Sequence, residues 1–87
     1  MKIAIVGSRM IGAVDISRYV SRGDEIVSGG AAGVDRCAAE YARKNGLPLT
    51  EFLPQYERYG RAAPLVRNRS IVDYAEKVIA FSRGDYR

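Results

Sequence analysis

Short apolar runs alternate with amphipathic segments along the chain, and this pattern predicts most of its secondary structure. The run "KIAIV" at 2–6 is continuous and ends at Gly7, which is typical of a strand buried on both faces. Further strands are predicted over 25–28, 48–53 and 77–81. Helical spacing of apolar residues predicts helices over 10–22, over 33–45 and from Pro64 to about Ala75, and residues 54–62 read as a polar loop.

The order of these elements predicts the fold class. Strands that alternate with helices indicate a Rossmann-like α/β fold, with three α/β/α layers and a small parallel sheet, for which we expect the strand order 3-2-1-4. The 87 residues form one domain, 1–87, without repeats or linkers. Ligands of parallel sheets bind beyond the carboxyl ends of the strands, so the residues that follow each strand are the first site candidates.

Two glycine-rich turns follow neighbouring strands, "GSR" at 7–9 and "SGGAAGVD" at 28–35. Glycine permits positive φ and close approach of backbone N–H groups, and the second turn opens a helix whose N-terminus attracts anions. These features predict a phosphate-binding loop, to which Ser8 and Arg9 add a hydroxyl and a guanidinium. The alternative is structural, because tight turns need glycine anyway and Asp35 complements the helix dipole. The sequence contains neither the dinucleotide fingerprint nor a P-loop.

The segment 58–75 combines four arginines with a helical pattern. Leu65, Asn68, Val72 and Ala75 fall on one stripe, with Ile71 beside it, and we expect this stripe to face the core. Asn68 is a polar residue in that stripe and must find partners there. It either bonds the glycine loops or a ligand, or it is a satisfied core amide that ties two loops together.

Composition narrows the chemistry. The net charge is +4, and eleven of the fourteen basic residues are arginine, which suits bidentate pairing with phosphate but also a solvated surface. The chain has no histidine and one cysteine, Cys37, so imidazole catalysis, histidine metal sites and thiolate clusters are excluded, and we expect no cofactor. The single cysteine and the absence of a signal peptide or a long apolar run predict a cytoplasmic protein that does not contact membranes.

Three stretches in order, "IVGSR" (5–9), "IVSGGAAGVDRCAAEYA" (26–42) and "PLVRNRSIVDYAEKVIAF" (64–81), resemble the SLOG superfamily. This Rossmann-like group includes the Lonely Guy phosphoribohydrolases and the DNA-processing protein A family. The resemblance implies a pocket for a nucleotide or nucleotide-derived ligand. The positions that match the motifs, and would line this pocket, are Gly7, Ser8, Arg9, Ser28, Gly29, Gly30, Gly33, Asp35, Arg67 and Asn68.

Two features depart from that resemblance. The Lonely Guy enzymes carry a catalytic glutamate four residues after the last glycine of their loop, and this chain has Cys37 there. Small bacterial and phage members also continue through an S-[RK]-G-T loop into another helix and strand, whereas this chain ends in "SRGDYR". We therefore expect a domain that lacks the C-terminal helix and strand of its longer relatives.

Three functions fit these features, ranked in this order. The first is a sensor or binding module for a nucleotide-derived small molecule, which needs only the glycine loops, Arg9 and Asn68. The second is a phosphoribohydrolase-like hydrolase of an N-glycosidic bond in a nucleotide, for which Asp35 is the candidate catalytic carboxylate. The third is single-stranded nucleic-acid binding by the arginines and tyrosines of 56–69.

A homodimer is expected on geometric grounds. Right-handed crossovers place the first two helices on one face of the sheet and the third alone on the other. One helix does not cover a four-stranded parallel sheet, the strand at 77–81 is apolar, and no further helix is expected before Arg87. Pairing of two copies about a two-fold axis would bury the exposed face.

Overall fold

The computed structural model describes residues 1–7, 15–30 and 33–81, which form a parallel α/β fold. One sheet with the order β3-β2-β1-β4, in which every neighbouring pair is parallel, confirms the predicted fold class and strand order. Its strands are β1 (Lys2–Gly7), β2 (Glu25–Ser28), β3 (Leu49–Glu51) and β4 (Lys77–Phe81). The described helices are α1 (Val34–Asn45), α2 (Tyr56–Tyr59) and α3 (Ala63–Tyr74), with 3-10 turns η1 (Ile16–Arg18) and η2 (Gly60–Ala62).

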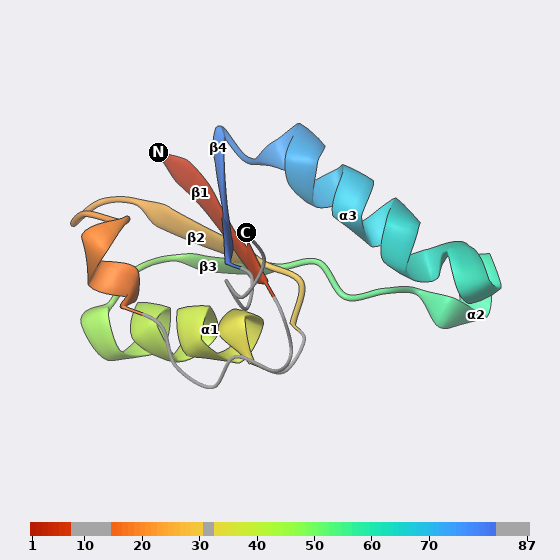
Figure 1. Ribbon diagram of the computed structural model, residues 1–87, viewed down its shortest axis with the longest axis horizontal. Coiled ribbons are helices and arrows are strands. Elements are labelled where there is room, and N and C mark those ends of the chain that lie inside the picture. The colour runs from red at the N-terminus through yellow and green to blue at the C-terminus, as the bar shows by residue number, and fades with distance from the viewer. Residues whose placement is uncertain (8–14, 31–32, 82–87) are drawn as a thin grey trace, which may run out of the picture.

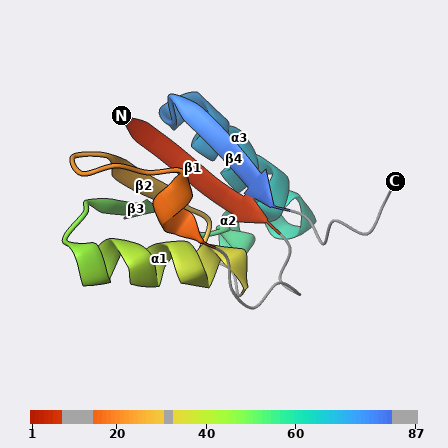
Figure 2. The same ribbon diagram turned by 60° about the vertical axis from the view of Figure 1, so that its left-hand side comes forward.

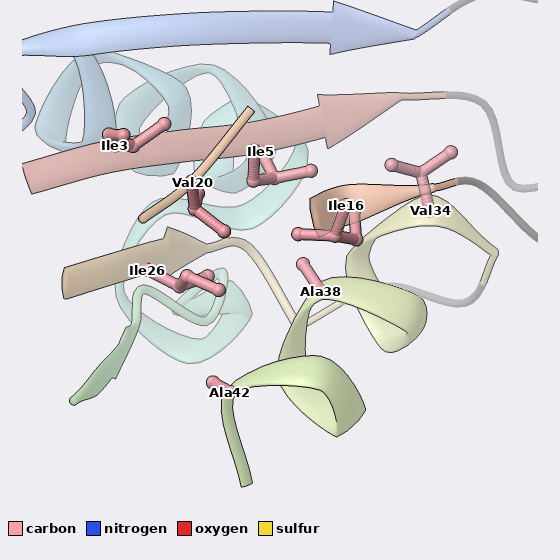
Figure 3. Close-up of a cluster of buried hydrophobic side chains, with 8 residues drawn as sticks. All are labelled: Ile3, Ile5, Ile16, Val20, Ile26, Val34, Ala38 and Ala42. Carbon is pink, nitrogen blue, oxygen red and sulfur yellow. The ribbon is translucent and has the colours of Figure 1, made fainter. Parts of the chain in front are cut away.

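Helices cover both faces of the sheet (Figures 1 and 2), with α1 and η1 on one face and α3 on the other. Successive residues of a strand point to opposite faces, so Ile3 and Ile5 of β1 enter one core and Ala4 enters the other. The smaller core, under α3, contains Ala4, Val27 and Ile71. Figure 3 shows the larger core, which joins the sheet to α1 and η1 and contains Ile3, Ile5, Ile16, Val20, Ile26, Val34, Ala38 and Ala42.

The helix predicted over 10–22 is wrong in its described part, since residues 15–22 contain only the 3-10 turn η1. Residues 8–14 lie outside the described part of the chain. The Ser21 N–H donates to the Asp24 side chain at 2.8 Å, and this bond competes with the backbone bonds of a continuous helix. Ile16 is nevertheless buried in the larger core, as the apolar spacing predicted.

The segment 54–62, predicted as a loop, contains the short helical turns α2 and η2. The carbonyl of Gln55 accepts the N–H groups of Arg58 and Tyr59, both at 3.0 Å, which closes α2. This segment carries few apolar residues and none of its helical residues is buried. The helical spacing of apolar residues that predicts α1 is therefore absent from this segment.

The helix α3 has the predicted extent but a different rotation. Leu65 and Val72, expected in the core, are 72% and 60% exposed, and Asn68 is exposed between them. The buried residues of α3 are instead Ala63 and Ile71. Helical spacing places Arg67 on the same side of α3 as these two residues. The Arg67 guanidinium donates a hydrogen bond to the carbonyl of Gly29, which follows β2.

Polar contacts also attach the C-terminal end of α3 to the sheet. Glu25, at the start of β2, accepts hydrogen bonds from Tyr74 at 2.6 Å and from Thr50 at 2.7 Å. These bonds, first the one from Tyr74, lower the pKa of the Glu25 carboxyl. The ammonium of Lys2 lies 4.2 Å from the centre of the Tyr74 ring. The C-terminal end of α3 therefore lies over the start of β2, and its N-terminal half lies toward the carboxyl ends of the strands.

The predicted homodimer has a defined surface to test. Val78, on the edge strand β4, is 45% exposed. We predict that sedimentation equilibrium at micromolar concentration gives twice the chain mass of 9.6 kDa, and that Val78→Lys returns the monomer mass because it places a charge on the exposed edge. If the wild-type protein sedimented with the mass of a single chain at all micromolar concentrations, the dimer prediction would be wrong.

Candidate functional site

A cavity of about 300 Å³ lies between α3 and the carboxyl ends of β1 and β2. Residues from all three motif-bearing stretches line it, although these stretches are far apart in the sequence. The structure thus brings five of the predicted site residues to one place. They are Gly7, Gly29, Asp35, Arg67 and Asn68.

The backbone of Gly29 is held from both sides. Its N–H donates to Asp35 Oδ2 at 3.2 Å, and its carbonyl accepts a hydrogen bond from Arg67 Nη1 at 2.7 Å. Asp35 lies in the first turn of α1 and is only 5% exposed, while Arg67 comes from α3. A Cβ at position 29 would lie 2.6 Å from Arg67 Nη1 and 3.0 Å from Asp35 Oδ2, so the arginine can approach this closely only because position 29 has no side chain, and it would have to shift for an alanine.

Arg67 and Asn68 act together. Arg67 Nε donates to Asn68 Oδ1 at 2.8 Å, so two hydrogen bonds orient the guanidinium. The carbonyl oxygen of the Asn68 side chain is engaged by this contact. Within the described ranges no hydrogen bond is made by its amide nitrogen, which can donate to a ligand.

The amides at the start of the predicted phosphate loop are bonded within the protein. Besides the Gly29 N–H, which meets Asp35, the Gly30 N–H donates to Ser28 Oγ at 3.1 Å. Ser28 is fully buried, and its hydroxyl donates to the Asp35 carbonyl at 3.4 Å. A ligand that used these two amides would have to displace Asp35 and Ser28. This geometry favours the structural interpretation for the first part of the turn.

Three other predicted residues that the structure describes, Ser28, Gly30 and Gly33, are not part of the cavity lining. Gly30 has φ +75° and faces Leu53, and Gly33 has φ +76° and caps α1, its carbonyl accepting the Cys37 N–H at 3.0 Å. Ser8 and Arg9 lie outside the described residues, so their part in the site stays a prediction. Within the described ranges, no group of three Cys, Asp or Glu side chains is placed to hold a metal ion.

The sequence analysis missed the apolar wall of the cavity, formed by Val6, Ile71, Val72 and Val78. Ala4 pairs with Val78 in the parallel register of β1 and β4, so Val78 shares the face of Ala4 and Val6 that α3 covers. The alternation of side chains between the two sheet faces within 2–6 and 77–81 predicts this shared face once the register of the two strands is known. Val72 was assigned to the core because the rotation of α3 was not foreseen.

Two glycines that line the cavity should respond differently to alanine. A Cβ at Gly7 would lie 2.6 Å from the backbone oxygen of Phe81 and 2.9 Å from Val34 Cγ2, both in packed structure. We expect Gly7→Ala to lower the free energy of unfolding by about 1–3 kcal/mol, measured by urea denaturation. Gly29→Ala meets the end of a flexible arginine and should cost less. Equal losses in the two variants would contradict this account.

Sequence comparison places the first two of the three stretches in a known family. The family described as "YAcAr: YspA, cpYpsA-related SLOG family" matches residues 1–59, which include β1, the glycine turn and α1 but not Arg67 or Asn68. Comparisons with the curated proteins and with the solved structures give no significant match. In the described part of the chain, no helix is long and apolar enough to span a membrane. Because the match spans more than half of the chain, and the parallel sheet has the order that a Rossmann-like fold requires, the protein belongs to the YspA, cpYpsA-related SLOG family.

Proposed function

We propose that this protein binds a nucleotide-derived ligand in the cavity between α3 and the carboxyl ends of β1 and β2. The observation that carries the proposal is the meeting of Gly7, Gly29, Asp35, Arg67 and Asn68 around one cavity. Ligands of open α/β sheets bind at this edge. Membership of a SLOG family is consistent with nucleotide-related binding or processing.

The polar groups of the cavity suit a ligand that both donates and accepts hydrogen bonds. An arginine side chain has five N–H donors, and the described contacts of Arg67 use two of them, toward Gly29 and Asn68. Further donors of Arg67 and the amide nitrogen of Asn68 can bond ligand oxygens or ring nitrogens. The Asp35 carboxylate can accept from hydroxyl or amino groups. This binding role needs neither a cofactor nor a metal ion.

A ligand screen with a matched pair of variants tests this proposal. We expect at least one nucleoside monophosphate, dinucleotide or ADP-ribose to raise the melting temperature by mass action. Arg67→Lys removes the planar fork that bonds Gly29 and Asn68 together, and should weaken binding about tenfold or more in calorimetry. Arg69→Lys, on the same helix but outside the cavity lining, is the control and should bind like the wild type.

Two outcomes of that screen would count against the proposal. If Arg67→Lys and Arg69→Lys bound the ligand equally well, the cavity would not be the site. If only a single-stranded oligonucleotide raised the melting temperature, the third function would take its place. The surface for it is on α2, where Tyr56 is 60% exposed and the Arg58 guanidinium lies 5.4 Å from the centre of the Tyr59 ring.

Hydrolysis of an N-glycosidic bond is the second candidate, because the Asp35 carboxylate lines the cavity and is almost fully buried. A carboxylate near the sugar could stabilise an oxocarbenium-like transition state. Asp35 already accepts the Gly29 N–H, however, and Cys37 occupies the position of the Lonely Guy glutamate. Binding without turnover therefore ranks first.

Asp35→Asn separates the two candidates. The amide oxygen can still accept the Gly29 N–H, and asparagine is accepted at a helix start, so we expect the variant to fold and to keep measurable binding, weakened by the loss of one acceptor oxygen. Chromatography of the bound nucleotide should detect no release of free base by either the wild type or Asp35→Asn. Release by the wild type that Asp35→Asn abolishes, with binding retained, would establish the hydrolase instead.

A further inference from the structure

We propose that the cavity recognises the uncharged nucleoside part of its ligand, the base and sugar, and leaves the phosphate outside. This inference rests on the proposed function and adds which part of a nucleotide lies between α3 and the sheet. Three features of the cavity carry it: the engaged amides of the glycine turn, the balance of charge in the lining, and the apolar wall.

The first feature is the state of the backbone donors. A phosphate site at the end of a strand uses backbone N–H groups that point at the anion. At this cavity the Gly29 N–H donates to the Asp35 carboxylate and the Gly30 N–H donates to the Ser28 hydroxyl. The described start of the turn therefore offers a phosphate no donor unless two buried side chains move.

The second feature is the charge of the lining. Among the lining residues that the structure describes, Arg67 is the one cation and Asp35 the one anion, so the formal charges of this described lining balance. A phosphate in the cavity would approach a carboxylate that is 5% exposed and poorly screened by water. A carboxylate accepts hydrogen bonds and cannot donate them. Its natural partner in a nucleotide is therefore a ribose hydroxyl or a base amino group.

The third feature is the shape and polarity of the remaining lining. Val6, Ile71, Val72 and Val78 form an apolar wall, against which a flat base can pack. The volume of about 300 Å³ is at the lower limit of the roughly 300–1,000 Å³ range of small-molecule sites. A single nucleoside fits this size better than a whole dinucleotide does.

Calorimetric titration at fixed ionic strength tests the inference with four nucleosides (adenosine, guanosine, cytidine and uridine), their 5′-monophosphates, ribose 5-phosphate and inorganic phosphate. We expect at least one nucleoside to bind within about tenfold of its monophosphate, and neither ribose 5-phosphate nor phosphate to compete with it. If a monophosphate binds while its nucleoside does not, or if ribose 5-phosphate competes, the inference is wrong and the proposed function stands. If none of these nucleosides or monophosphates binds, the inference is wrong, and the dinucleotides and ADP-ribose of the ligand screen decide the proposed function.

A matched pair of substitutions on α3 tests where the nucleoside lies. Val72 and Leu65 are both exposed aliphatic residues of this helix, and only Val72 lines the cavity. Val72→Asp should weaken nucleoside binding about tenfold or more, because it places a second carboxylate against the base, whereas Leu65→Asp should leave affinity within about twofold. Melting temperatures of both free variants show that they fold. Equal affinities of the two variants would overturn the placement.

Discussion

The two hydrogen bonds on the Gly29 peptide join the parts of this structure. The Gly29 N–H donates to Asp35, in the first turn of α1, and the Gly29 carbonyl accepts a hydrogen bond from Arg67 of α3. These helices cover opposite faces of the sheet, so the strands separate them along most of their length. Beyond the end of β2, the Gly29 peptide bonds to both. The cavity forms at this junction because side chains from both layers converge there around a residue without a Cβ.

Much of the fold follows from the sequence because buried strands and an amphipathic helix leave clear patterns. The apolar run ended by Gly7 and the spacing of Val34, Ala38 and Ala42 predict β1 and α1, and both are present. The pattern fails where polar contacts decide the local structure. After η1 the Ser21 N–H donates to the Asp24 side chain and not to a helical carbonyl, where apolar spacing alone would continue the helix.

The rotation of α3 shows the same limit at the site. Periodicity places Leu65, Asn68 and Val72 toward the core, but the side that turns to the sheet carries Arg67 and Tyr74, both of which bond polar groups of the sheet layer. Hydrophobic periodicity contains no information on such bonds. Motif resemblance predicted Gly29, Asp35 and Arg67 as site residues, yet it did not reveal that the Gly29 peptide bonds both side chains. A glycine indicates a close approach without indicating which group approaches.

The attachment of α3 has a consequence for local stability. Only Ala63 and Ile71 of this helix are buried, and hydrogen bonds at Gly29 and Glu25 hold its two halves. A helix with so little buried apolar surface is a natural unit of partial unfolding. The pKa of Glu25 is lowered from its ordinary value of 4.5, so its stabilising contribution is present above that pH and is lost as the pH falls through the lowered pKa of the folded state. Protonation of Glu25 would thus weaken the attachment of α3 at its Tyr74 end, and a ligand held between α3 and the sheet would counteract that loss.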